Sequence, residues 1–347
     1  MGSPMPFIND QLNQNNQQIA RDKHDQSINR VSRFKFNPEK VMSLLQERII
    51  GQPHVISAMQ DMLFTLKADF SDKSRPLSVM LFMGPTGVGK TETVRILAEA
   101  ILGSADKLCR IDMNTLAQEH YTAAITGSPP GYVGSKEGQT LFDIEKIKGT
   151  FSEPGIVLFD EIEKADKSVV RSLMNILDTG KLTLTSGLNE IDFNNTLIFM
   201  TSNIGAKQQA ENVNLYSQGW RNALRINPPS SEEILDKALN EHFDPEFVNR
   251  IDQMIPFNSL ENDQIKLLLD IEMNKLNKRL RRQQVSISVD AEAKQYLSLD
   301  YDKRYGARDI ARRIRIKLEP KLAQAMLLQP EKNEFKGVIT SGQLAIQ

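Results

Sequence analysis

The sequence predicts an α/β fold in which a wound parallel sheet is followed by a small, mostly helical C-terminal domain. Three observations support this prediction. Short apolar strands alternate with helices, as is typical of wound parallel sheets, and they run over Val79–Met83, Leu108–Ile111, Ile156–Phe159 and Thr196–Met200. Nearly every position of these strands is apolar, which suits strands that are covered on both faces. After Phe257 the alternation gives way to a long helical pattern.

These patterns divide the 347-residue chain into three parts. We expect residues 1–36 to be a disordered tail, because this polar, Gln- and Asn-rich segment buries too little apolar surface to offset its ordering entropy. A docking arm for a partner complex and an inert leader both remain open for this tail. Residues 37–258 form the expected large nucleotide-binding domain, and residues 259–347 form the expected small domain.

Local signals place the first and last elements. A helix is expected to begin near Asn37-Pro38, where Asn can cap and Pro suits the first position, and a second helix is expected to follow Gly51-Gln52-Pro53. The small domain is expected to contain a long helix, an alternating strand, two further helices and a closing strand. The ranges that can be read from the sequence are Leu260–Arg282 for the first helix, and Val285–Val289 and Phe335–Thr340 for the strands.

Composition argues against several classes of function. Lys and Arg number 43 against 44 Asp and Glu, so the formal net charge of −1 lacks the basic surplus typical of nucleic-acid-binding proteins. Cys109 is the only cysteine, which excludes an intrachain disulfide, and we expect it to be a small buried hydrophobe. The four histidines show no metal-ligand spacing. No apolar run approaches the ~18 residues of a membrane span, and the start lacks a secretory signal, so we expect a cytoplasmic protein without a membrane partner.

A glycine-rich segment carries the clearest chemical signal. It lies between the strand ending at Met83 and a helix expected over Glu92–Ile101, and it fits the phosphate-loop pattern with Gly84, Pro85, Thr86, Gly87, Val88, Gly89, Lys90 and Thr91. Glycines let successive backbone N–H groups face the phosphates of a nucleotide, and the helix N-terminus adds a favourable dipole. We expect Lys90 to reach the β- and γ-phosphates and the Thr91 hydroxyl to ligate Mg²⁺. The sequence therefore predicts ATP and Mg²⁺ as cofactors.

Two other strand ends supply polar groups for hydrolysis. The strand Ile156–Phe159 ends in Asp160 and Glu161, at the sheet edge where open α/β folds bind ligands. Asp160 is expected to hold Mg²⁺, and Glu161 to polarise the attacking water. If the strand ending at Asn203 is adjacent in the sheet, Asn203 lies beside the γ-phosphate. This combination indicates hydrolysis rather than binding alone.

Several segments also appear in the order found in one known family. They are Arg48-Ile49-Ile50-Gly51-Gln52, the phosphate loop, Gly131-Tyr132-Val133-Gly134, Asp160-Glu161-Ile162-Glu163-Lys164-Ala165, Thr201-Ser202-Asn203, Pro245-Glu246-Phe247-Val248-Asn249-Arg250-Ile251-Asp252 and Gly306-Ala307-Arg308. From about residue 38 to the C-terminus, the chain resembles the second ATPase module of Clp-family AAA+ unfoldases and disaggregases, such as ClpB and ClpA. It departs from the double-ring members because only a short polar tail precedes this one module.

The resemblance implies a role for particular residues. Ile49 and Ile50 would flank the adenine, and Asn203 would be the sensor-1 residue. Arg250 would be the arginine finger that reaches the γ-phosphate held by a neighbouring subunit, and Arg308 would be the sensor-2 arginine of the small domain. A planar, permanently charged guanidinium suits the charge that develops on a transferring phosphoryl group.

The resemblance also implies an assembly and a substrate. Tyr132 and Val133 would form a pore loop that grips a protein substrate in the channel of a homo-oligomeric, hexameric ring. Between Asn203 and Arg250 there is no Ile-Gly-Phe or Ile-Gly-Leu tripeptide, so a ClpP-type peptidase is not expected as a partner. We therefore expect an ATP-dependent protein unfoldase or disassembly chaperone. A nucleic-acid motor or loader and a non-translocating nucleotide switch are the alternatives.

Overall fold

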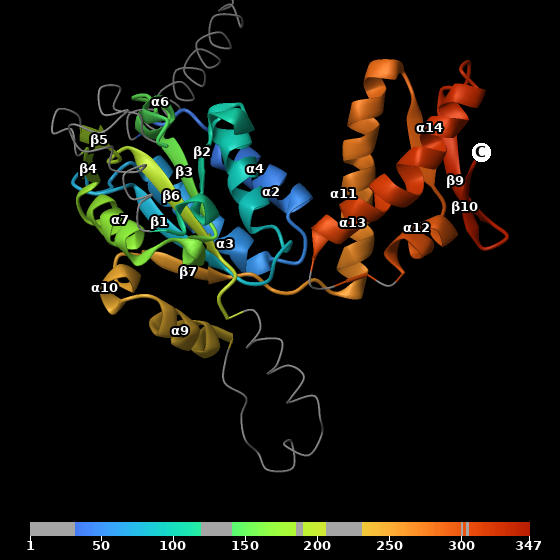
Figure 1. Ribbon diagram of the computed structural model, residues 1–347. Helices are drawn as coiled ribbons and strands as arrows, with labels where there is room; N and C mark the ends of the chain where they lie inside the picture. The colour runs from blue at the N-terminus through green and yellow to red at the C-terminus, as the bar shows by residue number, and fades with distance from the viewer. Residues whose placement is uncertain (1–31, 119–140, 185–189, 206–230, 300, 303–304) are drawn as a thin grey trace, which may run out of the picture.

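The structure, a computed structural model, shows a five-stranded sheet with helices on both faces, followed by a small, mostly helical unit (Figure 1). The predicted fold class is therefore confirmed. The residues that the structure describes are 32–118, 141–184, 190–205, 231–299, 301–302 and 305–347. Among them, no helix is long and apolar enough to cross a membrane.

All neighbouring strands of the large sheet are parallel, and the order across it is β2-β3-β6-β1-β7. The strands are β1 (Ser78–Met83), β2 (Cys109–Asp112), β3 (Gly155–Asp160), β6 (Thr196–Ser202) and β7 (Gln253–Pro256). The four predicted strands are present, with ends shifted by at most two residues, whereas β7 was not predicted. Because β6 lies between β1 and β3, the strand ends that carry the phosphate loop, the carboxylates and Asn203 are adjacent.

The alternation of side chains along the strands builds two cores. On β1, Met80 and Phe82 pack into one core, and Val79, Leu81 and Met83 pack into the other. The first core is covered by α2 (Pro38–Arg48), α3 (Pro53–Ala68) and α4 (Lys90–Leu102). The second is covered by α7 (Lys167–Thr179), α9 (Ser231–His242) and α10 (Pro245–Val248). Both predicted N-terminal helices are present, and the Asn37 side chain caps α2 by accepting from the backbone N–H groups of Glu39 and Lys40.

Short elements complete the large unit. They are a helix α6 (Ile144–Lys148), a hairpin of β4 (Lys181–Thr183) and β5 (Glu190–Asp192), and 3-10 turns over Ala105–Lys107, Met113–Leu116 and Ile162–Lys164. Cys109 is buried, as predicted, and burial raises the pKa of its thiol.

The small unit has its own core and a three-stranded sheet. Its elements are α11 (Asn262–Leu280), a 3-10 turn (Arg281–Gln283), β8 (Ser286–Val289), α12 (Ala291–Ser298), α13 (Ala307–Arg313), a π turn (Ile314–Leu318), α14 (Glu319–Leu328), β9 (Glu334–Thr340) and β10 (Gln343–Ile346). The predicted closing strand, β9, is the central one. It pairs in parallel with β8 and antiparallel with β10, which was not predicted.

The predicted tail extends too far toward the C-terminus. Phe34 and Phe36 are buried in the first core, although the prediction assigned them to the polar segment. Arg33 pairs with Asp69 at 3.2 Å, and the Lys67 ammonium donates to the Phe34 carbonyl. Two buried aromatic rings supply the apolar area that fixes residues 33–36 on the domain.

Candidate functional site

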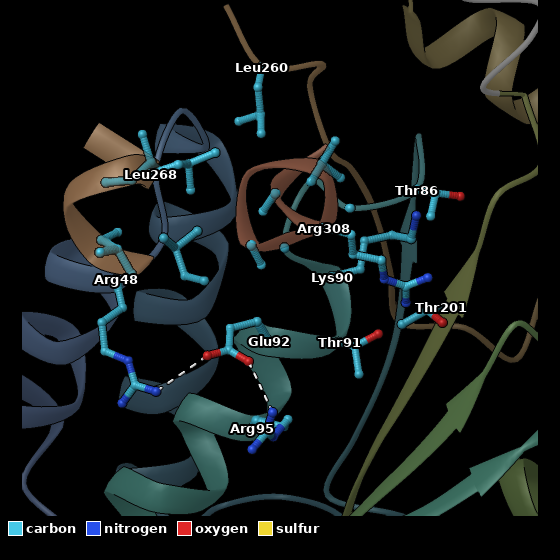
Figure 2. Close-up of a pocket in the computed structure, with 18 of the residues that line it drawn as sticks. Arg48, Thr86, Lys90, Thr91, Glu92, Arg95, Thr201, Leu260, Leu268 and Arg308 are labelled. Carbon is cyan, nitrogen blue, oxygen red and sulfur yellow. Dashed lines mark hydrogen bonds and ion pairs between the residues drawn. The ribbon is translucent and has the colours of Figure 1, made fainter. Parts of the chain in front are cut away.

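The phosphate loop joins the end of β1 to the start of α4. Gly84, Gly87 and Gly89 have φ values of 136°, 77° and 111°, which L side chains rarely adopt, so these glycines let the loop turn tightly. The loop lines a cavity of about 410 Å³ between the two units, from Thr86 to Thr91. In Figure 2, Lys90, Thr91, Thr201 and Arg308 lie together at one side of this cavity, whereas Leu268 lies at the other side, near Arg48.

The Lys90 ammonium is held inside the loop. Its Nζ donates to the carbonyls of Gly84 and Pro85 at 2.5 and 2.8 Å and to Asn203 Oδ1 at 2.9 Å. Burial lowers the pKa of Lys90 to about 8, against the opposing effect of nearby carboxylates, chiefly Glu163. A buried cation at the start of helix α4 suits a polyanion such as the phosphates of ATP.

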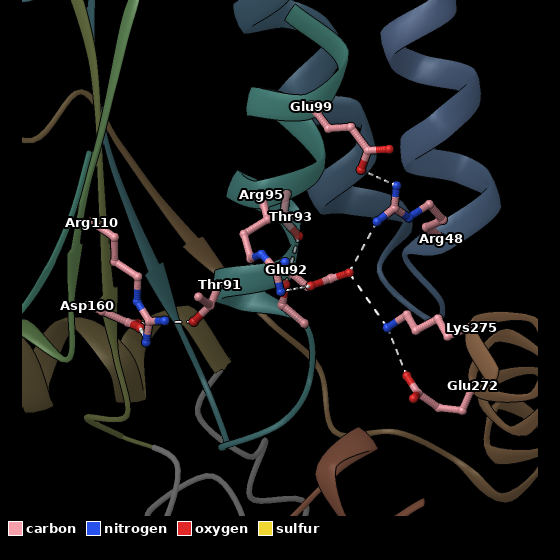
Figure 3. A network of polar contacts seen from close by, with 11 residues as sticks. Arg48, Thr91, Glu92, Thr93, Arg95, Glu99, Arg110, Asp160, Glu272 and Lys275 are labelled. Atoms are coloured by element: carbon pink, nitrogen blue, oxygen red, sulfur yellow. Dashed lines mark hydrogen bonds and ion pairs between the residues drawn. The ribbon is translucent and has the colours of Figure 1, made fainter. Parts of the chain in front are cut away.

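Asp160, which is buried at the end of β3, is the centre of a group of donors. Its Oδ1 accepts from the hydroxyls of Thr91 at 3.1 Å and Thr201 at 2.5 Å, and its Oδ2 accepts from Arg110 at 2.6 Å (Figure 3). A hydroxyl and a carboxylate this close supply the oxygen ligands that Mg²⁺ prefers, and Mg²⁺ needs few protein ligands when it is bound to a nucleotide. Thr91 and Asp160 therefore fit the predicted metal role.

Glu161 follows directly and lines the cavity in a left-handed backbone conformation, with φ of 61°. Its backbone N–H donates to the Thr201 hydroxyl at 3.0 Å, and its carboxylate accepts from Asn114 Nδ2 at 2.6 Å. This carboxylate can accept a proton from a water in the cavity, which is the role that the sequence predicted.

Asn203 lies where the topology requires, just after the end of β6 and between the phosphate loop and the carboxylates. Its Oδ1 also accepts from the Thr86 hydroxyl at 3.4 Å, while its Nδ2 donates to Glu163 at 3.1 Å. The strand adjacency that the sequence analysis required for its role is present.

Aliphatic side chains also line the cavity, together with the charged side chains of Arg48, Glu272 and Lys275. Ile49 and Ile50, the predicted adenine-flanking residues, line it from the large unit. Leu268 and Ile271 of α11 line it from the small unit. Aliphatic contact from both units suits a flat purine base.

The start of α13 sits directly on the phosphate loop. The Ala307 N–H donates to the Gly87 carbonyl at 2.9 Å, and the backbones of Gly87 and Gly306 touch so closely that a Cβ on either would clash. Arg308, the predicted sensor-2 residue, lines the cavity near Lys90 (Figure 2). The small unit thus brings a cation to the phosphate end of the site.

A charged network that includes residues lining the cavity joins the two units. Glu92 pairs with Arg48 at 3.4 Å and with Lys275 of α11 at 3.7 Å (Figure 3). Arg48 also pairs with Glu99 at 2.6 Å. Such partly exposed pairs contribute ~0–1 kcal/mol each, so they orient the units more than they hold them together.

Arg250 does not belong to the cavity of its own chain. Its guanidinium pairs with Asp178 at 2.8 Å and donates to the Glu246 carbonyl. Its Nε is buried and makes no hydrogen bond with any residue that the structure describes. Tyr132 and Val133 lie outside the described residues.

Sequence reasoning missed several partners around the site. Arg110, Asn114 and Thr201 all contact Asp160 or Glu161, and Glu163 contacts Asn203. Thr201 and Glu163 lie within recognised segments, and Arg110 and Asn114 flank the end of the neighbouring strand. The position of Arg110 and Asn114 near the end of β2, the neighbour of β3, was the signal that could have identified them.

The chain is similar to known proteins along most of its length. It matches the family model for the AAA domain (Cdc48 subfamily) over residues 75–254 and that for the C-terminal, D2-small domain of ClpB protein over residues 260–338. It is 41% identical to the ATP-dependent protease ATP-binding subunit-like protein AmiB of Pseudomonas aeruginosa, over 93% of each chain. It is 37% identical to ClpC of Staphylococcus saprophyticus and to the chaperone protein ClpB of Chlamydia muridarum, over 84% and 88% of this chain but 35% and 33% of theirs.

Proposed function

Because the chain belongs to the Clp family of AAA+ ATPases, we propose that it is a single-ring, hexameric motor in which ATP hydrolysis drives the unfolding or disassembly of protein substrates. ATPase activity follows from the family itself. One observation carries the proposal of a ring, namely that Arg250 lies outside the cavity of its own chain. If Arg250 takes part in hydrolysis, it must therefore act on the nucleotide cavity of a neighbouring subunit.

Each polar residue of the cavity has a separate proposed role in ATP binding or hydrolysis. Lys90 binds the β- and γ-phosphates, and Thr91 and Asp160 hold Mg²⁺, which when bound neutralises phosphate charge. Glu161 takes the proton of the attacking water, and Asn203 orients that water against the γ-phosphate. Arg308 stabilises phosphate charge from the small unit of the same chain, so its contact also reports nucleotide state to that unit.

Protein is the proposed cargo for two reasons. The relatives named as a chaperone and as a protease ATP-binding subunit align with most of this chain, and the near-neutral overall charge does not favour a polyanionic cargo. Coupling to a peptidase is not part of the proposal, because neither Ile-Gly-Phe nor Ile-Gly-Leu occurs between Asn203 and Arg250.

The test of the proposal uses the full chain and its Glu161→Gln variant, which is expected to bind ATP without hydrolysing it. An unfolded protein such as casein should stimulate wild-type turnover, and the variant should retain that protein with ATP and release it when the nucleotide is removed. Lys90→Ala, which should not bind ATP, is the matched control. Stimulation by single-stranded DNA instead, with a steep dependence on salt, would replace protein by nucleic acid as the cargo.

A further inference from the structure

The turn after β3 carries a third carboxylate that the mechanism above does not use. Asp160 ends the strand, Glu161 follows with φ of 61°, and the 3-10 turn Ile162–Lys164 brings Glu163 back toward the end of β6. A positive φ at a non-glycine residue is strained and persists only where the surrounding structure holds it. The strained turn therefore aims three carboxylates in different directions within four residues.

Glu163 accepts two hydrogen bonds from Asn203. Its Oε1 accepts from the backbone N–H and from the side-chain Nδ2 of Asn203, both at 3.1 Å. An amide side chain has a donor end and an acceptor end, so fixing Nδ2 on a carboxylate fixes where the oxygen points. That oxygen faces the Lys90 ammonium at 2.9 Å.

The charge of Glu163 also affects the site. Among the groups that oppose the burial of Lys90, the Glu163 carboxylate has the largest effect on the pKa of that lysine. Its other oxygen, Oε2, is buried and makes no hydrogen bond within the described part of the chain. A buried oxygen without a partner destabilises the fold, so its presence here needs a reason beyond packing.

We propose that Glu163 is a positioning residue for ATP turnover, which holds the Asn203 amide in one orientation and gives the Lys90–Asn203 pair a fixed anionic partner. Glu163 does not line the nucleotide cavity, so it acts through Asn203 rather than on the nucleotide. The inference rests on the role proposed above for Asn203.

The experiment compares four variants of the full chain: Glu163→Ala, Glu163→Gln, Asn203→Ala and the double variant Glu163→Ala/Asn203→Ala. Glu241→Gln is the matched control, because Glu241 lines the same hollow as Glu163 and Asn203 but is exposed. For each variant, kcat and KM for ATP, the Kd of a fluorescent ATP analogue and the melting temperature are measured.

Glu163→Ala should lower kcat by about tenfold or more while KM and Kd stay within about threefold, because the nucleotide's own contacts are intact. Glu163→Gln should fall between Ala and wild type, because its amide oxygen can still accept from Asn203. In the Asn203→Ala background, Glu163→Ala should lower kcat by less than about twofold, since two residues that act through one contact are not additive.

Besides Glu163 variants that turn over ATP at the wild-type rate, two results would overturn the inference. One is a loss of kcat in the double variant that equals the product of the losses in Glu163→Ala and Asn203→Ala, since independent effects combine in this way. The other is a parallel loss of nucleotide binding and melting temperature in Glu163→Gln, which would make the role structural. If Asn203→Ala itself turned over ATP at the wild-type rate, the role of Asn203 would fail first, whereas an impaired Asn203→Ala with silent Glu163 variants would reject only this inference.

Discussion

The contact between Gly306 and the phosphate loop can be tested by a single substitution, Gly306→Ala. Gly306 has φ of 54° and ψ of −143°, a conformation almost confined to glycine. A Cβ on this residue would lie 2.4 Å from the Gly87 carbonyl oxygen and 2.5 Å from the Gly87 carbonyl carbon. These are backbone atoms, so Gly306→Ala must either distort the loop or move α13 away from it.

The size of the effect follows from the lost interactions. Backbone strain costs about 1–3 kcal/mol, and losing the hydrogen bond from the Ala307 N–H to the Gly87 carbonyl costs about 0.5–1.5 kcal/mol. Together they disfavour the docked position of α13 by about 1.5–4.5 kcal/mol, or about 10- to 1,600-fold, since each 1.4 kcal/mol is tenfold. Because Arg308 moves with α13, we expect ATP affinity to fall by at least about tenfold.

The assay is the Kd of a fluorescent ATP analogue, measured together with the melting temperature. Gly342→Ala is the matched control, because Gly342 also lies in the small unit at positive φ, 76°, but a Cβ added there would meet no described atom within 4 Å. That variant should lose some stability and keep its ATP affinity. If Gly306→Ala folds and binds ATP within about twofold of wild type, the docked helix does not contribute to nucleotide binding.

The site supports three further predictions. Because the pKa of Lys90 is lowered to about 8, ATP affinity should decline as the pH rises above about 8, by up to about tenfold per pH unit, while adenosine affinity stays flat in the same titration. Arg250→Ala homomers should keep ATP binding and lose turnover, and mixing them with Lys90→Ala should restore some activity; no rescue in demonstrated mixed rings would argue against action between subunits. Tyr132→Ala should keep basal ATP turnover but fail to remodel a protein substrate, whereas Tyr132→Phe should retain both, and wild-type remodelling by Tyr132→Ala would favour a nucleotide switch.

The predictable parts of the fold are those with a strong local pattern. The phosphate loop needs three glycines at positive φ and a lysine at a fixed spacing, so the sequence alone identifies it. The long apolar runs of β1, β3 and β6 are equally distinctive. β7 and β10, which were not predicted, each have four residues and begin with Gln. Phe34 and Phe36 were missed because their burial depends on packing against a helix that follows in the sequence.

The partners around the carboxylates could not be predicted for a similar reason. Asp112 pairs with Asp160 across β2 and β3, and Phe159 pairs with Met200 across β3 and β6. This register brings Asn114 to Glu161 and Thr201 to Asp160. Register is a property of the assembled sheet, and one residue of slip would remove both contacts.

The turn from Asp160 to Glu163 carries the groups proposed for metal binding, for water activation and for positioning Asn203. Asp160 faces the Thr91 hydroxyl, Glu161 faces Asn114, and Glu163 faces Asn203. The positive φ of Glu161 permits this divergence, because a regular continuation of β3 would send alternate side chains to opposite faces of the sheet. Because the three carboxylates share one turn, a shift of the turn that alters the contact of one carboxylate also moves the other two. Arg308, by contrast, lines the same cavity from a separate unit, so it can move away from the site while the three carboxylates keep their places.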